Sequence, residues 1–369
     1  MLVIIPSLDL VAAWNDSLID DHDKSPGNPN TRNNQALKLL AASVSDRGPR
    51  GPSTARTVLG VEGARFTVNG APTFLYGMSY FGALAAPEAF IRQDLDQMQQ
   101  NGFNWIRVWA NWRGFGAEAA AVDREGRGMT NGLEKLKWLV GECDRRGMIV
   151  DVTLSRGKDG AGSPQLQTLE AHRHAVETLV TALRPHRNWY LDLANERNIR
   201  DKRFISFDDL KDLRALAKKL APEVLVTASH SPDISPQELR EYVETVGVDF
   251  ISPHRARNAS SPAETAAKTK EYLEKLGQLG RVLPVHYQEP FRRGYSRDWN
   301  PAAADFVRDA LAARHGGAGG WCFHNGDNRI AADGKPRRSF DLREKPLFEQ
   351  LDSEELKAIE TLKGQFRAN

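Results

Sequence analysis

The chain has 369 residues, of which 40% are hydrophobic and 27% are charged. This composition is typical of a globular protein with a large core and unlike that of a disordered chain. Lys and Arg total 50 against 48 Asp and Glu, so the formal net charge is only +2. Such a balance provides no global field that would gather nucleic acid or an anionic membrane, so we expect neither as a partner.

The first 56 residues differ in character from the rest. The opening MLVIIPSLDLVAAW is apolar but has no basic region before it and is interrupted by Asp9, so it predicts neither a signal peptide nor a membrane-spanning helix. Residues 20–56 are rich in Asp, Asn, Pro, Gly, Ser and Arg, with one short helix candidate at 35–43. We expect an N-terminal arm and linker over residues 1–56 and one domain, ending in a C-terminal helix, over residues 57–369.

Eight short apolar runs follow residue 56 and alternate with amphipathic helical stretches, which is typical of parallel βαβ units. In chain order the runs are FLYGMSY, WIRVWAN, MIVDVTLS, WYLDLANE, EVLVTAS, DFISPH, VLPVHYQE and GWCFHNG. Eight such units close most simply into a (β/α)8 TIM barrel with an N-terminal extension, and an open doubly wound sheet is the alternative. The two cysteines, Cys143 and Cys322, fall in segments predicted to be buried, so we expect no disulfide framework.

Serine and asparagine residues followed by proline predict three of the helix starts. Ser235-Pro236 and Ser261-Pro262 each place a capping residue before a proline and have a glutamate three residues after the serine. Asn300-Pro301 repeats the combination of cap and proline.

Polar residues at the ends of the predicted strands are the first candidates for a site, because barrel active sites lie at the carboxyl ends of the strands. Two of these residues are carboxylic acids, Glu196 and Glu289. Burying an unpaired acid at the end of an apolar strand costs several kcal/mol unless the site uses it. The others are Arg107, Trp109, Asn195, His230, His254, Arg255, Tyr287, Trp321, His324 and Asn325.

This set resembles the strand-end residues of clan A retaining glycoside hydrolases, particularly the family 5 cellulase and mannanase group. An Asn-Glu pair ends strand 4 in that clan, as LANE does at Asn195-Glu196, and a glutamate ends strand 7, as in HYQEP at Glu289. An arginine on strand 2 corresponds to Arg107, and a tryptophan on strand 8 corresponds to Trp321. The order of the motifs along the chain makes the resemblance fairly specific.

The resemblance implies a hydrolase of β-linked poly- or oligosaccharides that retains anomeric configuration, acting on β-glucan or β-mannan. Glu196 would be the acid/base and Glu289 the nucleophile, with Arg107 holding Glu289 ionised. Asn195 would bind the sugar 2-hydroxyl, and Trp321 would form an apolar floor beneath the reacting sugar.

Three further residues are candidates for substrate binding. Trp109 would extend the aromatic platform, and His254 lies at the end of strand 6. The family often has a tyrosine two residues after that histidine, where this chain has Ala256. Tyr287 is a candidate to supply the missing hydroxyl group.

Other classes of site find less support in the sequence. A Schiff-base aldolase needs a lysine on a strand, and none of the eight runs contains one. His172 and His174 lie two apart on a predicted helix and face different directions, so no metal and no cofactor are implied. A catalytically silent barrel that binds carbohydrate remains the alternative.

Arginines near strand ends 6 and 7 are interpreted as solvated loop charges; if they faced the cleft instead, they would favour an acidic or sulfated sugar. They are Arg255, Arg257, Arg292 and Arg293.

Overall fold

The computed structural model describes residues 57–111, 119–156, 166–200, 204–294, 296, 298–325 and 340–366, together with the backbone of four further short strands. The chain divides into two compact units, residues 1–54 and 55–369. In the first unit, β1 (Leu2–Ile5) and β2 (Leu10–Ala13) pair as an antiparallel hairpin. The helix expected at residues 35–43 lies outside the described residues.

All eight predicted apolar runs contain strands, and these strands form a closed barrel. Seven are joined in parallel in the order β10-β9-β8-β7-β6-β14-β13, and β11 pairs in parallel with β12. The Ile251 N–H donates to the Pro284 carbonyl and the Asp249 N–H donates to the Val226 carbonyl, each at 3.0 Å, which closes the ring. The prediction of a (β/α)8 barrel is therefore confirmed, and the open doubly wound sheet is excluded. The barrel strands are β6 (Leu75–Ser79), β7 (Trp105–Trp109), β8 (Ile149–Thr153), β9 (Trp189–Asp192), β10 (Leu225–Thr227), β11 (Ser229–His230), β12 (Ser252–Pro253), β13 (His286–Tyr287) and β14 (Gly320–Phe323).

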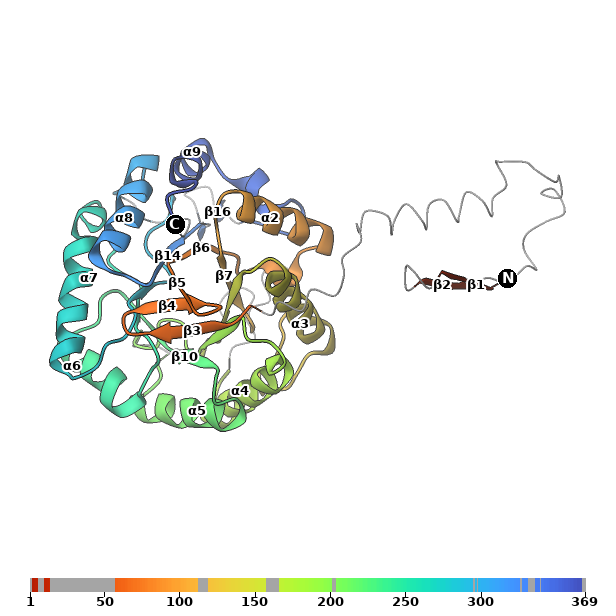
Figure 1. Cartoon of the computed structure of the whole chain (residues 1–369), viewed down its shortest axis with the longest axis horizontal. Helices are drawn as coiled ribbons and strands as arrows, with labels where there is room; N and C mark the ends of the chain where they lie inside the picture. The colour runs from red at the N-terminus through yellow and green to blue at the C-terminus, as the bar shows by residue number, and fades with distance from the viewer. Residues whose placement is uncertain are drawn as a thin grey trace. The chain divides into compact units, whose positions relative to one another are not determined.

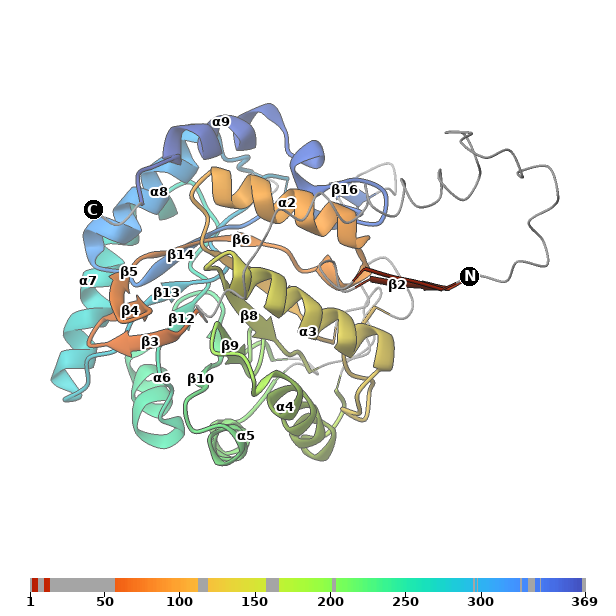
Figure 2. The same ribbon diagram turned by 45° about the vertical axis from the view of Figure 1, so that its right-hand side comes forward.

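Helices surround the strands as an outer ring (Figures 1 and 2). They are α2 (Glu88–Gln100), α3 (Thr130–Arg145), α4 (Leu169–Leu183), α5 (Phe207–Leu220), α6 (Pro236–Arg240), α7 (Ser261–Gln278), α8 (Ala303–Gly316) and α9 (Ser353–Leu362). Shorter helical turns are η4 (Ala83–Ala85), η5 (Glu241–Val246) and η6 (Leu347–Gln350), and a further hairpin joins β15 (Asp327–Ile330) to β16 (Pro336–Arg338). None of the helices in the described residues is long and apolar enough to cross a membrane.

Successive strand residues point alternately into the barrel and out to the helices. Trp105, Ile149, Tyr190 and Cys322 point inward and pack together in the barrel interior. Gly77 leaves room for the indole of Trp105, because a Cβ at Gly77 would lie 1.5 Å from that ring. The outward residues join the larger core between strands and helices.

A three-stranded antiparallel sheet that the sequence interpretation did not include precedes the barrel. It consists of β3 (Leu59–Glu62), β4 (Arg65–Val68) and β5 (Ala71–Thr73). Figure 1 shows it lying across one end of the barrel. Phe66 is fully buried and packs edge-on against Phe250 of the interior cluster, so the sheet caps the end of the barrel away from the carboxyl ends of the strands.

A helix begins close to each of the three predicted starts, but only one of the three predicted caps is correct. Ser235 caps α6 and forms a capping box with Glu238. Helix α7 begins at Ser261 and has Ser260 as its cap, so the expected cap at Ser261 is wrong. Asn300 is not a cap either, because its side chain accepts from the Gly294 N–H and α8 begins only at Ala303. Cys143 and Cys322 are buried and free, as predicted.

Candidate active site

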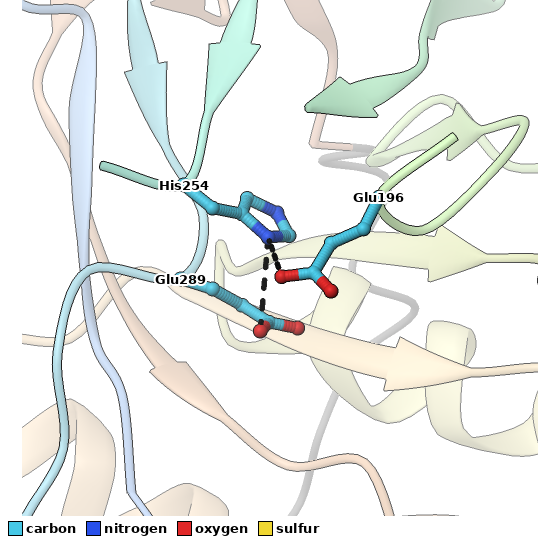
Figure 3. Close-up of side chains that lie close together, drawn as sticks. All are labelled: Glu196, His254 and Glu289. Atoms are coloured by element: carbon cyan, nitrogen blue, oxygen red, sulfur yellow. Dashed lines mark hydrogen bonds and ion pairs between the residues drawn. The ribbon is translucent and has the colours of Figure 1, made fainter. Parts of the chain in front are cut away.

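The two predicted glutamates lie next to each other at the carboxyl ends of the strands. Glu196 follows β9 and is 8% exposed, and Glu289 follows β13 and is 5% exposed. Together with His254, which follows β12, each offers a polar atom within 4.8 Å of the others. Figure 3 shows both carboxylates converging on the His254 ring. The barrel therefore brings together two nearly buried acids from opposite parts of the sheet.

Arg107, fully buried on β7, links Glu289 to two aspartates deeper in the barrel. Its Nη1 donates to Glu289, its Nε to Asp151 at 3.0 Å, and its Nη2 to Asp192 at 3.0 Å. The same Nη2 also donates to Asn195 Oδ1 at 3.0 Å, which fixes the orientation of that amide. Arg107 is thus a rigid positive centre behind the two acids, as charge-assisted hydrogen bonds to three carboxylates leave its guanidinium one orientation.

The groups around Glu289 favour its ionised form. Burial by itself would raise the pKa of Glu289, but His254, Arg107, His324 and Arg257 together hold it well below its ordinary value of 4.5. Asp151 differs, because burial raises its pKa to about 7 even though Arg107 favours its charged form. Glu289 is consequently a carboxylate at any pH near neutrality.

Arg257, from the loop after β12, contacts both glutamates. Its Nη2 donates to Glu196 Oε1 at 3.1 Å and to Glu289 Oε2 at 2.8 Å. Its Nε donates to the Pro290 carbonyl at 3.0 Å, which anchors the guanidinium between the loops that follow β12 and β13. A single nitrogen thus lies between the two acids.

His254 is held in one tautomer by its neighbours. Its Nδ1 lies 3.1 Å from Glu196 Oε1 and 3.7 Å from Glu289 Oε2. Carboxylate oxygens accept, so Nδ1 carries the proton in this arrangement. Nε2 is buried and has no hydrogen-bond partner among the residues that the structure describes.

His324, after β14, closes the other side of Glu289. Its Nδ1 lies 2.7 Å from Ser79 Oγ, and its Nε2 lies 3.0 Å from Arg292 Nη1 and 3.6 Å from Glu289 Oε2. Because a guanidinium only donates, Nε2 accepts and Nδ1 donates to the serine hydroxyl. Burial lowers the pKa of His324 well below its ordinary value despite the nearby Glu289, so the ring is neutral.

The backbone at two of these positions is left-handed. Glu196 has φ +48° and Arg255 has φ +62°, a conformation that costs about 1–2 kcal/mol for a residue other than glycine. The Glu196 N–H donates to Ser229 Oγ at 3.0 Å, which helps to hold the turn. Backbone strain of this kind concentrates at functional sites, where the surrounding structure enforces it.

Two of the predicted substrate-binding residues point away from the site. Tyr287 is fully buried, and its hydroxyl lies 2.6 Å from Thr269 Oγ1 on α7. Trp321 is also fully buried, and its Nε1 donates to Asp309 on α8 at 2.7 Å. Both side chains are on the outward face of their strands, so the expectations of a hydroxyl from Tyr287 and a sugar floor from Trp321 are wrong.

Replacing Trp321 with alanine is therefore expected to impair folding more than the site. Removing a buried indole costs about 3–5 kcal/mol and leaves Asp309 Oδ2 without the indole donor, although Asp309 Oδ1 still accepts from Thr265 Oγ1. Urea denaturation should show this loss, with Trp321→Phe as the milder control because it removes only the hydrogen bond and part of the ring. A Trp321→Ala protein of wild-type stability would contradict the assignment to the core.

Trp109 does reach the mouth of the barrel. Its side chain is half-buried at the end of β7 and packs edge-on against Phe81, with ring centroids 6.2 Å apart. Phe81 in turn lies 5.7 Å from the His324 ring. These two aromatic residues form a partly exposed apolar wall beside His324.

The interpretation of the four loop arginines as solvated charges is wrong for at least two of them. Arg255 is 2% exposed and donates to Asp233 at 2.7 Å. Arg257 lies on the two glutamates, as described above. Arg292 contacts His324, and Arg293 donates to Asp352 at 2.6 Å.

Asp151 and Asp192 are part of the site, although the sequence interpretation left them out. Each is the lone acid of its strand, in IVDVT and WYLD, and each points inward to Arg107. A buried acid of this kind needs a charged partner, so the pattern itself was a signal for a polar centre inside the barrel.

Glu196, His254 and Glu289 carry the type and spacing of ligand atoms that a divalent cation uses. Two guanidinium groups already donate to the same carboxylates, Arg107 to Glu289 and Arg257 to both. A second cation at this point would face both arginines at close range, so the arrangement suits an organic substrate better than a metal ion.

No protein-family model matches the sequence, and no curated protein matches it. Solved structures do match. The endo-1,4-β-mannanase of Rhizomucor miehei has a TM-score of 0.61 at 11% identity, with 84% of this chain and 99% of that chain covered. A family 5 glycoside hydrolase of Bacteroides vulgatus has a TM-score of 0.61 at 15% identity, with 84% of this chain and 71% of that chain covered. The β-1,4-D-mannanase of Cryptopygus antarcticus has a TM-score of 0.56 at 13% identity, with 84% of this chain and 95% of that chain covered. The resemblance to family 5 glycoside hydrolases is thereby confirmed at the level of the fold.

Proposed function

We propose that this protein is a glycoside hydrolase that cleaves β-linked poly- or oligosaccharides and retains the anomeric configuration. The observation that carries the proposal is the pair of nearly buried glutamates, Glu196 and Glu289, with polar atoms within 4.8 Å. Retaining enzymes hold their carboxyl groups ~5–5.5 Å apart, whereas inverting enzymes need ~6.5–9.5 Å to admit a water molecule. The spacing supports direct attack by one of the two acids.

The surroundings of the two acids favour distinct roles. Glu289 is held ionised by Arg107 and its neighbours, as a nucleophile must be. Its oxygen forms a bond to the anomeric carbon while the glycosidic bond breaks and Glu196 donates its proton to the leaving oxygen. Water then attacks the same carbon, Glu196 takes up a proton from it, and the bond to Glu289 breaks.

Asn195 and the aromatic wall supply contacts for the sugar itself. Since Asn195 Oδ1 accepts from Arg107, its amide nitrogen is oriented to donate to a sugar hydroxyl. Trp109 and Phe81 offer apolar faces on which a pyranose ring can stack. The similar structures from Rhizomucor miehei and Cryptopygus antarcticus are described as mannanases. We therefore place β-mannan first and β-glucan second among the substrates to test.

A catalytically silent barrel that binds carbohydrate is the alternative function. Turnover of aryl β-mannosides and aryl β-glucosides, with β-mannan and β-glucan in parallel, separates the two. Release of the aryl group or of shorter sugars supports the hydrolase, provided that it disappears in Glu289→Gln. Binding of either polysaccharide by the intact protein with no turnover of any of the four would overturn the proposal.

The activity should have a bell-shaped pH profile, because one acid must be ionised and the other protonated. The acidic limb follows Glu289, whose lowered pKa places that limb below pH 4.5. The basic limb follows loss of the proton from Glu196. In Glu196→Gln the basic limb should vanish, and substrates with very good leaving groups should keep partial activity; a profile with the wild-type limbs would reject the assignment.

A further inference from the structure

A cavity of about 580 Å³ lies beside the loop that follows β9 and takes no part in the chemistry described so far. Its walls come from this loop and from the starts of α5 and α6, which are neighbours in the outer ring of helices (Figure 1). Binding sites for small molecules typically have volumes of ~300–1,000 Å³. The cavity is therefore large enough to bind an organic ligand.

The wall of the cavity begins at the residue next to the proposed proton donor. Arg197 lines the cavity and directly follows Glu196 in the chain. The Glu196 N–H donates to Ser229 Oγ at 3.0 Å, and the Arg197 N–H donates to the Ser229 carbonyl at 3.1 Å. In the proposed reaction Glu196 gives its proton to the leaving oxygen. The loop that lines the cavity is thus the loop whose glutamate contacts the leaving half of the substrate.

Arg197 contributes a fixed positive charge to the cavity wall. Its side chain is 4% exposed, and its guanidinium carbon lies 3.8 Å from the centre of the Phe207 ring. Its Nη1 donates to the Ile205 carbonyl at 2.9 Å, and its Nη2 donates to Glu238 Oε1 at 3.3 Å. Contact with a ring face and hydrogen bonds to two acceptors hold the guanidinium in one position.

The charged residues that line the cavity leave an excess of positive charge. They are Arg197, Arg200 and Glu238, and the carboxylate of Glu238 already accepts from Arg197. Arg200 is exposed and has no ion-pair partner among the residues that the structure describes. The acids of the first turn of α5, Asp208 and Asp209, do not line the cavity. One negative charge on a ligand would balance the wall, and a guanidinium binds carboxylate and sulfate groups well.

Phe204 gives the same cavity an apolar face. This residue is 45% exposed, although a phenylalanine is usually buried. The amides of Asn198 and Gln237 and the hydroxyl of Ser206 also line the cavity. An exposed ring together with amide and hydroxyl groups suits a sugar, which has an apolar ring face and hydroxyl groups at its edge.

We propose that this cavity binds an acidic sugar residue on the leaving-group side of the bond that is cleaved. The inference rests on the proposed function. The sugar ring stacks on Phe204, its carboxylate or sulfate group accepts hydrogen bonds from Arg200, and the charge of Arg197 adds to the attraction. The preferred substrate is then a β-linked chain that contains acidic residues.

Three trisaccharides test the proposal. Each has a mannosyl residue joined by a β-1,4 bond to a dimer of mannose, of mannuronate or of 6-O-sulfated mannose. The wild type should cleave the first bond of at least one acidic compound with a kcat/KM about tenfold above that of the neutral one, as expected from a charge-assisted hydrogen bond. The better acidic compound identifies the group as carboxylate or sulfate. Equal or lower values for both acidic compounds would overturn the proposal. The glucose series replaces these compounds if aryl β-glucosides are the better aryl substrates.

Arg200→Gln removes the exposed charge from the cavity wall. The ratio of kcat/KM between the acidic and the neutral trisaccharide should fall close to one, mainly through a loss for the acidic compound. Arg240→Gln is the matched control, because Arg240 is exposed on α6, pairs with Glu244 and does not line the cavity. The control should keep the wild-type ratio. A wild-type ratio in Arg200→Gln would mean that the cavity does not select the acidic sugar.

Phe204→Ala tests the apolar face separately from the charge. It should lower kcat/KM for the neutral and the acidic trisaccharides by similar factors, because stacking of a sugar ring does not depend on the acidic group. The preference for the acidic compound should persist. Wild-type kcat/KM for all three compounds would show that the sugar does not lie on Phe204.

Binding can be measured without turnover by calorimetric titration of the wild type with thio-linked forms of the same trisaccharides. The preferred acidic compound should bind about tenfold more tightly than the neutral one. This difference in Kd should become smaller in Arg200→Gln and at high ionic strength, since salt screens exposed charges. Equal Kd values for the acidic and the neutral compounds would contradict the assignment of the cavity.

The outcomes distinguish this inference from the function on which it rests. Tighter binding of an acidic compound, with no cleavage of any trisaccharide or aryl glycoside, would mean that the proposed function is wrong while the cavity still binds an acidic sugar. Cleavage of aryl glycosides, with equal kcat/KM for the acidic and the neutral trisaccharides, would mean that only the role of the cavity is wrong.

Discussion

Glu289→Gln should lower kcat by a factor on the order of 10⁴ or more while leaving the fold intact. The amide cannot attack the anomeric carbon, and removal of a nucleophile typically costs this much. The substitution keeps the shape of the side chain and removes one of three carboxylates from Arg107. Steady-state kinetics on aryl β-glycosides measures the effect, with circular dichroism as the check on folding.

Glu349→Gln is the matched control, because this glutamate lies in η6 and its contact is with Gln93 on the outside of the barrel. It should retain wild-type kcat. A Glu289→Gln enzyme within tenfold of the wild type would remove Glu289 from the chemistry.

Arg107→Met should destabilise the protein by about 3–5 kcal/mol, the cost of leaving buried charges without their partner. Asp151, Asp192 and Glu289 would all lose the guanidinium that they share. Urea denaturation at pH 7 measures the loss. Arg240→Met removes an exposed arginine paired with Glu244 and should change stability by less than about 1 kcal/mol.

The loss of unfolding free energy in Arg107→Met should depend on pH. Glu289 has a lowered pKa in the folded protein, so its contribution to stability is present above its unfolded value and is lost as the pH falls through the folded one. The difference in unfolding free energy between wild type and Arg107→Met should therefore become smaller as the pH falls. A difference in unfolding free energy that is small at pH 7, or that grows as the pH falls, would show that Arg107 does not stabilise the buried carboxylates around it.

The barrel could be predicted because its signal is repeated along the chain. Eight apolar runs separated by helical stretches leave few topologies, and strand ends on one face then place Glu196, Glu289, Arg107 and His254 together. Asn195 followed from its position beside Glu196. No single run was decisive, but their order was.

The face of a residue near a strand end was harder to predict. Tyr287 is the last residue of β13 and Trp321 is the second residue of β14, and a shift of one position reverses the side on which a side chain points. Gly320 faces the barrel interior, since a Cβ there would lie 2.5 Å from the His286 ring. The neighbour of an inward residue points outward, which places Trp321 against α8.

Other features could not be predicted because they depend on loops or were overlooked. Arg257 reaches the two acids from the loop after β12, where Arg255 has a left-handed backbone, and nothing in the local sequence fixes that path. The β3–β5 sheet did have a signal, since Asn69-Gly70 between alternating strands is typical of a tight hairpin.

Covalent trapping at Glu289 tests the central claim most directly. The wild-type protein, incubated with 2-deoxy-2-fluoro-β-mannosyl fluoride and separately with the glucosyl reagent, should gain the mass of one fluorosugar as activity is lost. Peptide mapping should place the sugar on Glu289, in a peptide that also contains Tyr287 and Pro290. Proton NMR of the first product formed from an aryl β-glycoside should show the β anomer. An α anomer as the first product, or a label on any other residue, would contradict the account.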